Sequence, residues 1–135
     1  MERLTIGVLA KLAGSGVETI RFYERKGLVI QPPRKGLSYR QYPLSVVGRI
    51  RFIKRAKDLG FSLKEVAELL NLRVDPQTTC ADVKARAEKK IEDVADKIME
   101  LQRIQNALAK LAATCYGDRP TDECPILAAL DKEEG

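Results

Sequence analysis

The sequence predicts a mainly α fold: a winged helix-turn-helix, then a long helix that forms an antiparallel coiled coil, then a cysteine loop with a short helix. Three observations predict it. Two short amphipathic segments flank the glycine-bearing turn at residues 14–16, residues 80–115 contain neither proline nor glycine, and two of the three cysteines enclose a polar loop. We therefore expect three parts, at residues 1–78, 79–114 and 115–135.

The first part opens with two short helices. Thr5 is a good helix N-cap, and the apolar residues after it keep helical spacing until Gly14. A second amphipathic segment begins at Val17 and ends at Gly27, a favourable C-terminal cap. Two short helices joined by a turn that contains glycine indicate a helix-turn-helix.

A short β-ribbon, or wing, is predicted next, in residues 28–43. Two prolines at residues 32–33 break the helix, Lys35 and Gly36 favour a turn, and Tyr39 and Tyr42 alternate with Arg40.

Two further helices complete this part. Residues 44–60 carry an apolar stripe at helical spacing, and Gly60 ends this expected helix. In residues 62–72, Ser62 and Glu65 have the spacing of a capping box at the start of the next helix. The apolar side chains expected to be buried are Val46 or Val47, Ile50, Ile53, Leu59, Leu63, Val66, Leu69 and Leu70. Residues 73–78 form the expected linker.

The long segment from Cys80 to Cys115 should be one continuous helix, with Thr78 or Thr79 as its cap. Alternating steps of four and three residues from Cys80 trace a stripe whose central heptads are mostly apolar. This stripe has little to pack against within the chain, so we infer a homodimer. Packing of the helix back onto residues 1–78 is the alternative.

Charge divides the chain unequally. Residues 1–75 carry 15 Lys and Arg against 7 Asp and Glu, whereas residues 76–135 carry 9 against 12. A concentrated positive half is typical of a domain that binds nucleic acid phosphates. The chain has no histidine for acid–base work and no glycine-rich phosphate loop, which argues against an enzyme. With three cysteines and no long apolar run, we expect a cytoplasmic protein with free thiols.

The cysteine spacing predicts a metal site shared between subunits. Cys80 and Cys115 lie 35 residues apart, which in a helix is roughly 50 Å. In an antiparallel pair, Cys80 of one subunit arrives beside Cys115 of the other, and Cys124 folds back to supply a third thiolate. Three thiolates suit Hg(II), with Pb(II) or Cd(II) as alternatives; zinc prefers a fourth ligand. Inert burial of the cysteines and a disulfide between Cys115 and Cys124 remain open.

Four stretches of the first 72 residues resemble one family of proteins. The segments TIGVLAKLAG, VETIRFYERKGL, YRQY and RIRFIKRAKDLGFSLKEVAELL are similar in combination to the N-terminal domain of the MerR family of transcriptional regulators. The long helix and cysteine loop resemble its metal-sensing branch. Copper and gold sensors of that branch carry serine at the start of the long helix, whereas the pattern at 80, 115 and 124 is most similar to the family's mercury-responsive regulator.

The resemblance implies a homodimer on a two-fold symmetric operator in promoter DNA. Such a protein represses without metal, and on binding metal it distorts the DNA so that the RNA polymerase already bound can start transcription. The resemblance also implies residue roles. Glu18 and Arg21 would lie at base edges, and Ile20 and Phe22 would pack inside. The residues implied to bind phosphates are Tyr23, Lys35, Tyr39 and Arg40.

Two other functions compete with this interpretation. A thiol-based redox regulator on the same DNA-binding scaffold would use Cys115 and Cys124 and would not need Cys80. The second is a metal carrier that does not bind DNA, in which the positive charge of residues 1–75 would be incidental.

Overall fold

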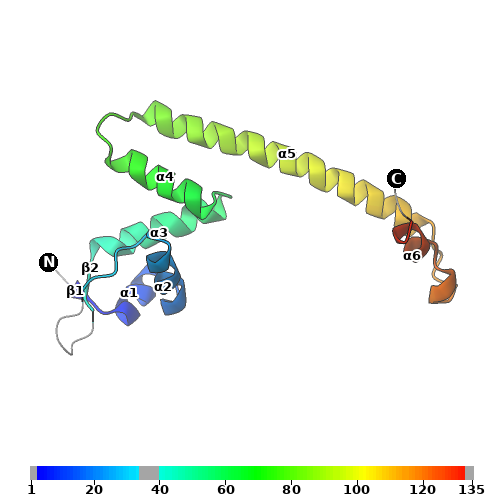
Figure 1. Ribbon diagram of the computed structural model, residues 1–135, viewed down its shortest axis with the longest axis horizontal. Helices are drawn as coiled ribbons and strands as arrows, with labels where there is room; N and C mark the ends of the chain where they lie inside the picture. Colours follow the sequence, from blue (N-terminus) through cyan, green and yellow to red (C-terminus); the bar gives the residue numbers. More distant parts are fainter. Residues whose placement is uncertain (1–2, 34–39, 133–135) are drawn as a thin grey trace. The chain divides into compact units, whose positions relative to one another are not determined.

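The computed structural model describes residues 3–33 and 40–132, and these are mainly helical, as predicted (Figure 1). The bounds of the helices and strands are β1 (Arg3–Leu4), α1 (Ile6–Ala13), α2 (Val17–Arg25), β2 (Tyr42–Pro43), α3 (Ser45–Asp58), α4 (Leu63–Val74), α5 (Cys80–Ala113), the 3₁₀ turn η1 (Thr121–Glu123) and α6 (Pro125–Leu130).

The chain divides into two compact units, Met1–Arg86 and Ala87–Gly135. The first unit includes the opening turns of α5, where Arg86 forms an ion pair with Glu68 of α4. The predicted boundary near residue 78, which separates parts by function, stays a prediction.

The helix-turn-helix is confirmed, with the predicted residues at its ends. The Thr5 hydroxyl accepts a hydrogen bond from the Val8 N–H at 3.3 Å, and Gly14 ends α1 in the left-handed conformation with φ 68°. The Ser15 N–H donates back to the Ala10 carbonyl at 3.0 Å. A side chain at this φ would be strained, so glycine fixes where α1 stops and the turn begins.

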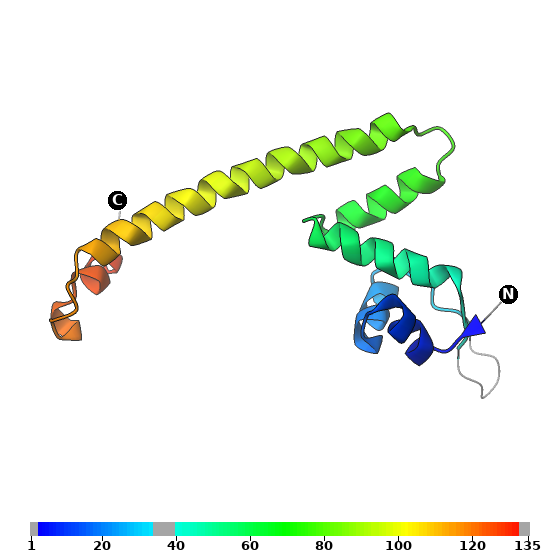
Figure 2. The same ribbon diagram turned by 180° about the vertical axis from the view of Figure 1, so that it is seen from behind.

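The core of the first unit lies where α1, α2, α3 and α4 meet (Figure 2). Leu9, Ile20, Ile50, Ile53 and Val66 have no exposed surface. These residues come from all four helices, so the helix-turn-helix is held as part of one core.

Most of the predicted core residues of α3 and α4 are confirmed. Val47 and Leu70 are buried as well, and Leu63 and Leu69 are partly buried against the core. The prediction for Leu59 is wrong, because this residue lies just past the end of α3 and is 70% exposed.

Three cations of α3 hold the helix-turn-helix by its backbone. Arg49 Nε donates to the Leu28 carbonyl at 2.5 Å and Arg51 donates to the Leu12 carbonyl at 2.7 Å. The Lys54 ammonium donates to the Gly14 carbonyl. Leu12 and Gly14 lie at the end of α1, where carbonyls lack partners within the helix and carry partial negative charge, so Arg51 and Lys54 satisfy and stabilise them. Arg49 holds the segment that follows α2.

The capping box of α4 is confirmed. The Glu65 N–H donates to the Ser62 hydroxyl at 3.2 Å, and the Ser62 N–H donates to the Glu65 carboxylate at 2.8 Å. Against α3, the Arg73 guanidinium lies 5.6 Å from the centroid of the Phe52 ring.

The predicted wing is described only in part. Strand β2 pairs antiparallel with β1, with Leu4 opposite Tyr42, and β1 was not predicted from the sequence. Residues 34–39, which include Lys35 and Tyr39, lie outside the described residues.

Tyr42 joins the base of the wing to α2. Its side chain is 1% exposed, and its hydroxyl donates to Glu24 Oε2 at 2.9 Å. Burial, followed by the hydrogen bond and negative charge of Glu24, raises the pKa of Tyr42 to about 12. The neutral phenol is therefore the form that the fold stabilises.

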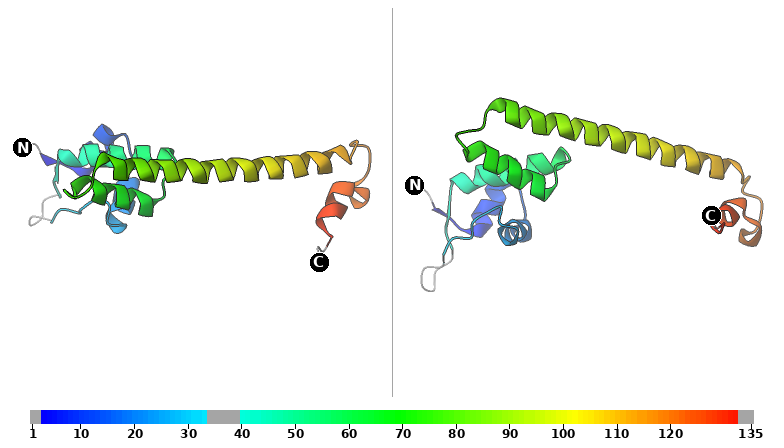
Figure 3. Two further views of the ribbon diagram at one scale, coloured as in Figure 1. Left: turned by 90° about the horizontal axis from the view of Figure 1, so that it is seen from above. Right: turned by 45° about the horizontal axis from the view of Figure 1, so that its top comes forward.

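The continuous helix is confirmed: α5 runs for 34 residues without a break (Figure 3). The Thr79 N–H just before it donates to the Asp82 carboxylate at 2.8 Å, and the Thr78 hydroxyl donates to the Leu72 carbonyl at 2.6 Å. None of the α5 side chains is buried. Among the described residues, no helix combines the length and apolar character that crossing a membrane requires.

We predict that Arg49→Ala lowers the free energy of unfolding by about 1 to 3 kcal/mol, because the Leu28 carbonyl loses its charged donor. Urea unfolding at one fixed protein concentration measures the loss. The matched control is Arg55→Ala, since Arg55 is an exposed cation on the same helix. Equal losses in both variants would contradict the role given to Arg49.

We also predict that the stability advantage of the parent over Tyr42→Phe depends on pH. The pKa of Tyr42 rises from 10.0 to about 12 in the fold, so this contribution is complete below pH 10 and is lost as the pH rises through 12. Denaturant unfolding of both proteins from pH 8 to 12 should show the difference shrinking above pH 10. A difference in the free energy of unfolding that stays constant from pH 8 to 12 would refute this prediction.

Candidate functional site

Helix α2 presents a polar face to solvent. The residues buried on its other side are Ile20 and Tyr23, which are three positions apart and therefore on one face. The exposed residues of this helix and its cap are Glu18, Thr19, Arg21, Phe22, Arg25 and Lys26. Four of these six side chains are charged, so the exposed face suits a polar, charged partner such as nucleic acid.

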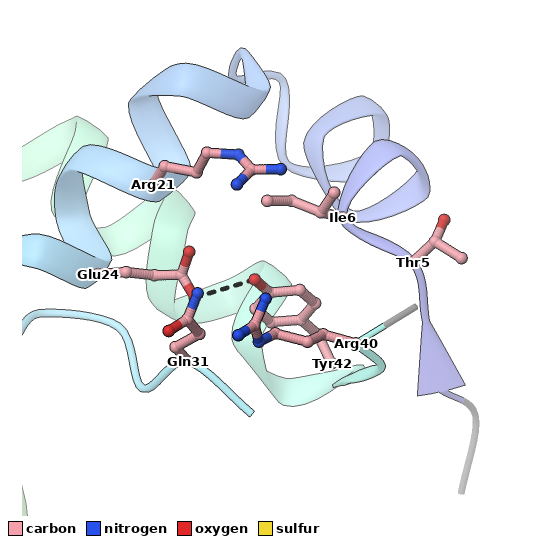
Figure 4. A pocket seen from close by; sticks show the side chains of 7 residues that line it. All are labelled: Thr5, Ile6, Arg21, Glu24, Gln31, Arg40 and Tyr42. Atoms are coloured by element: carbon pink, nitrogen blue, oxygen red, sulfur yellow. Dashed lines mark hydrogen bonds between the residues drawn. The ribbon is translucent and has the colours of Figure 1, made fainter. Parts of the chain in front are cut away.

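Arg21 and Arg40 line a small pocket beside the base of the wing (Figure 4). The pocket has a volume of about 100 Å³. Its other lining residues are Thr5, Ile6, Glu24, Gln31 and Tyr42. The one carboxylate in this lining accepts the Tyr42 hydrogen bond, and the two guanidinium groups leave the pocket with net positive charge.

Arg40 brings an unused donor to this pocket. Its Nε is buried and has no hydrogen-bond partner among the described residues. Arginine presents several N–H donors in a plane that matches phosphate oxygens. The pocket is thus chemically suited to hold one oxygen-rich anionic group.

The residues that the resemblance implied as DNA contacts differ in how exposed they are. Glu18 and Arg21 are exposed on α2 and Arg40 is half-buried at the pocket. Tyr23 belongs to the core and is 5% exposed, and burial followed by the charge of Asp58 raises its pKa. Its phosphate contact stays a prediction, and the observed role of its ring is packing.

Phe22 corrects the sequence prediction. It was expected to pack inside with Ile20, but it is 36% exposed. The reason is helical spacing: Phe22 lies four residues after exposed Glu18, whereas buried Ile20 and Tyr23 occupy the opposite side. Arg25 and Lys26 approach its ring, with the charged groups 5.9 Å and 5.6 Å from the centroid.

Sequence reasoning missed the part that Glu24 and Gln31 play in the pocket. Glu24 lies one helical turn after Arg21, and this i, i+3 spacing was the signal available. Gln31 lies after the end of α2, and only the tertiary fold brings it to the same pocket as Arg40. No local sequence pattern therefore indicates its place in the pocket.

The three cysteines are free thiols at the two ends of α5 and beyond. Cys80 is the first residue of α5 and is exposed. Cys115 follows the helix and is half-buried, and its Sγ accepts a hydrogen bond from the Gly117 N–H at 3.3 Å. Cys124 is half-buried directly before α6. The thiolate is the form in which a cysteine binds metal.

One helix keeps Cys80 away from the other two thiols. Since α5 is continuous over 34 residues, its ends are roughly 50 Å apart. Within residues 3–33 and 40–132 of a single chain, no group of three Cys, Asp or Glu side chains is placed to hold a metal ion.

The apolar stripe of α5 is uncovered. Along it, Ile91, Val94, Ile98, Leu101 and Leu108 are between 41% and 67% exposed. A shallow apolar groove on this helix is lined by Ile98, Leu101, Gln102, Ile104, Gln105 and Leu108. An exposed stripe of this length is typical of a surface that another protein covers.

Comparison with protein families matches most of the chain. Residues 4–72 match the MerR HTH family regulatory protein model, and residues 47–111 match the model described as MerR, DNA binding.

Similar proteins extend the match to the full chain. The mercuric resistance operon regulatory protein of Shigella flexneri is 45% identical over 135 residues, covering 100% of this chain and 92% of its own length. The HTH-type transcriptional regulator CueR of Escherichia coli O6:H1 is 41% identical over 127 residues, covering 94% of this chain and 93% of its own.

A solved structure agrees with the fold. The transcription regulator PbrR691 from Ralstonia metallidurans CH34, in complex with lead(II), has a TM-score of 0.83 and 36% identity, covering 94% of this chain and 98% of its own. Family models and relatives together cover both the helix-turn-helix and the cysteine-bearing end. The chain belongs to the MerR family of DNA-binding transcriptional regulators.

Proposed function

We propose that this chain is an Hg(II)-responsive regulator that represses its promoter without metal and activates it when metal binds. The observation that carries the proposal is the placement of three free thiols, with Cys80 at the start of α5 and Cys115 and Cys124 beyond its end. Soft thiolates favour thiophilic ions. The name of the Shigella flexneri relative supports mercury among these ions.

The uncovered stripe on α5 supports a homodimer. Burial of apolar surface contributes about 25 cal/mol per Å², so the exposed side chains between Ile91 and Leu108 would gain stability from a second copy. An antiparallel pair places Cys80 of one copy beside Cys115 of the other, at both ends of the coil. Two-fold symmetry then gives two equal sites.

In this dimer each site holds three sulfur ligands from two subunits. Cys115 and Cys124 come from one subunit, on either side of the loop that contains η1, and Cys80 of the second subunit completes the set. The Gly117 N–H donates a hydrogen bond to the Cys115 Sγ at 3.3 Å. Bound Hg(II) would supply a coordination centre that favours few, soft ligands.

Pb(II) and Cd(II) are the runner-up ions. The solved relative PbrR691 is in complex with lead(II), and three thiolates also suit that ion. A copper response, suggested by the name of the 41% identical relative, fits less well, because the resemblance places serine where this chain has Cys80.

The DNA-binding part of the proposal uses the exposed face of α2 and the pocket beside it. Arg21 is suited to the guanine edge in the major groove, Glu18 to a neighbouring base, and Arg40 to a phosphate. Lys35 and Tyr39 remain proposed phosphate contacts. Membership in a family of DNA-binding regulators argues against a metal carrier that ignores DNA.

The start of α5 connects the metal to the DNA-binding part. Cys80 follows the short linker after α4, and Arg86 in the next turns pairs with Glu68 of α4. Metal that draws Cys80 toward the second subunit therefore pulls on the segment that carries the helix-turn-helix. The resulting rigid-body shift would distort the promoter DNA for RNA polymerase.

We predict that Cys80→Ala retains promoter binding but loses the transcription that Hg(II) induces. The thiol is exposed and lies outside the DNA-facing residues, so its loss removes one ligand and little else. Gel shift and transcription in vitro, with and without Hg(II), measure the two effects. The control is Ala81→Ser, a neighbouring exposed change that leaves every sulfur in place.

Anaerobic titration with Hg(II) distinguishes a site of three sulfur ligands from a site of two. Absorption from thiolate-to-metal charge transfer should saturate at two Hg(II) per dimer in the parent chain, and with a weaker, two-sulfur signature in Cys80→Ala. Full activation by Cys80→Ala would refute the shared site. Activation by peroxide, with Cys115 and Cys124 oxidised, would favour a redox regulator.

We further predict that Leu101→Glu turns the dimer into monomer, because a charge replaces an apolar side chain on the exposed stripe. Light scattering after size exclusion measures the mass. Met99→Glu is the matched control, since Met99 is also exposed but lies off the stripe. A dimer that survives Leu101→Glu, or that Met99→Glu also splits, would contradict the proposed interface.

A further inference from the structure

Phe22 is an apolar ring placed on a charged surface. It is 36% exposed, and the other exposed residues of α2 are polar or charged. Covering a phenylalanine completely contributes roughly 1.5–3 kcal/mol, and the fold leaves about a third of this ring uncovered, whereas Ile20 and Tyr23 on the same helix are buried. The surface is therefore suited to a partner that can cover the ring.

The surroundings of the ring specify the partner. Arg25 and Lys26 stand 5.9 Å and 5.6 Å from the ring centroid, and Arg21 is the preceding residue. Two cations beside one apolar ring, on a helix that also carries Arg21, repel a basic partner and attract a polyanion. Duplex DNA offers an apolar group beside negatively charged backbones, namely the C5-methyl of thymine, which the major groove exposes to a helix.

The ring is already held in position. The Tyr23 ring lies 6.1 Å from it, tilted by 50°, and is itself buried in the core. The two cations approach the same ring, so Phe22 has contacts from both its own helix and the following turn. A side chain held this way gives up little rotational freedom on binding.

We propose that Phe22 is a specificity-determining residue that contacts the C5-methyl of a thymine in the operator. The inference rests on the proposed function as a DNA-binding regulator and adds one base preference to it. Phe22 lies one helical turn from Glu18, about 6 Å away, and bases on one strand are about 3.4 Å apart. The thymine therefore lies within about two base pairs of the base nearest Glu18 and Arg21.

Deoxyuridine tests this contact directly, because it pairs as thymine does but lacks the methyl group. Duplexes that the parent chain selects from a random pool first define the operator. Each thymine is then replaced by deoxyuridine, symmetrically in both half-sites. One replacement should weaken the parent about fourfold per half-site, the value of roughly one buried methyl, and should leave Phe22→Ala unchanged.

Two further variants keep the comparison decisive. Thr19→Ala changes another exposed residue of α2 and should respond to deoxyuridine as the parent does. Phe22→Gln removes the ring but keeps a longer side chain than alanine, and thermal unfolding identifies which Phe22 variant is folded for the comparison. If parent and Phe22 variants lose equal affinity at every thymine, the methyl contact is refuted. If the parent binds no duplex at all, the proposed function itself fails.

Discussion

The proposed function depends on one structural constraint, the uninterrupted helix α5. Because α5 has no proline or glycine, it separates Cys80 from Cys115 by its whole length and leaves its apolar stripe uncovered. One antiparallel partner would account for both features, because a second copy running in the opposite direction would cover the stripe and bring the thiols together. A break in α5 would let one chain fold back on itself and would remove the need for a partner.

The positive charge of the first unit has two different uses. Arg49, Arg51 and Lys54 donate to backbone carbonyls at the ends of the first two helices, so much of their charge is committed to holding the helix-turn-helix on α3. Arg21 and Arg40 instead line the pocket beside the base of the wing. Net charge alone therefore overstates the surface available to phosphates, since some cations stabilise the fold that positions the others.

Sequence reasoning predicted the features that local chemistry fixes. Thr5, Gly14 and the Ser62–Glu65 capping box act on their own backbone, and the absence of helix breakers after Cys80 is visible in the sequence. It failed where tertiary contacts decide. Strand β1 exists only through its pairing with β2, and Leu59 and Phe22 were assigned to the core by residue type although their positions face solvent.

A shared ligand set is what would let metal act as a switch. A ligand shifts a conformational equilibrium only when it binds one state more tightly than the other. A site made of Cys115 and Cys124 alone lies after α5 in one chain and takes no ligand from the second subunit. Adding Cys80 of the second subunit makes affinity depend on how the two chains sit, because this thiol moves with the segment that follows α4. The third sulfur thus supplies the differential affinity that the proposed activation requires.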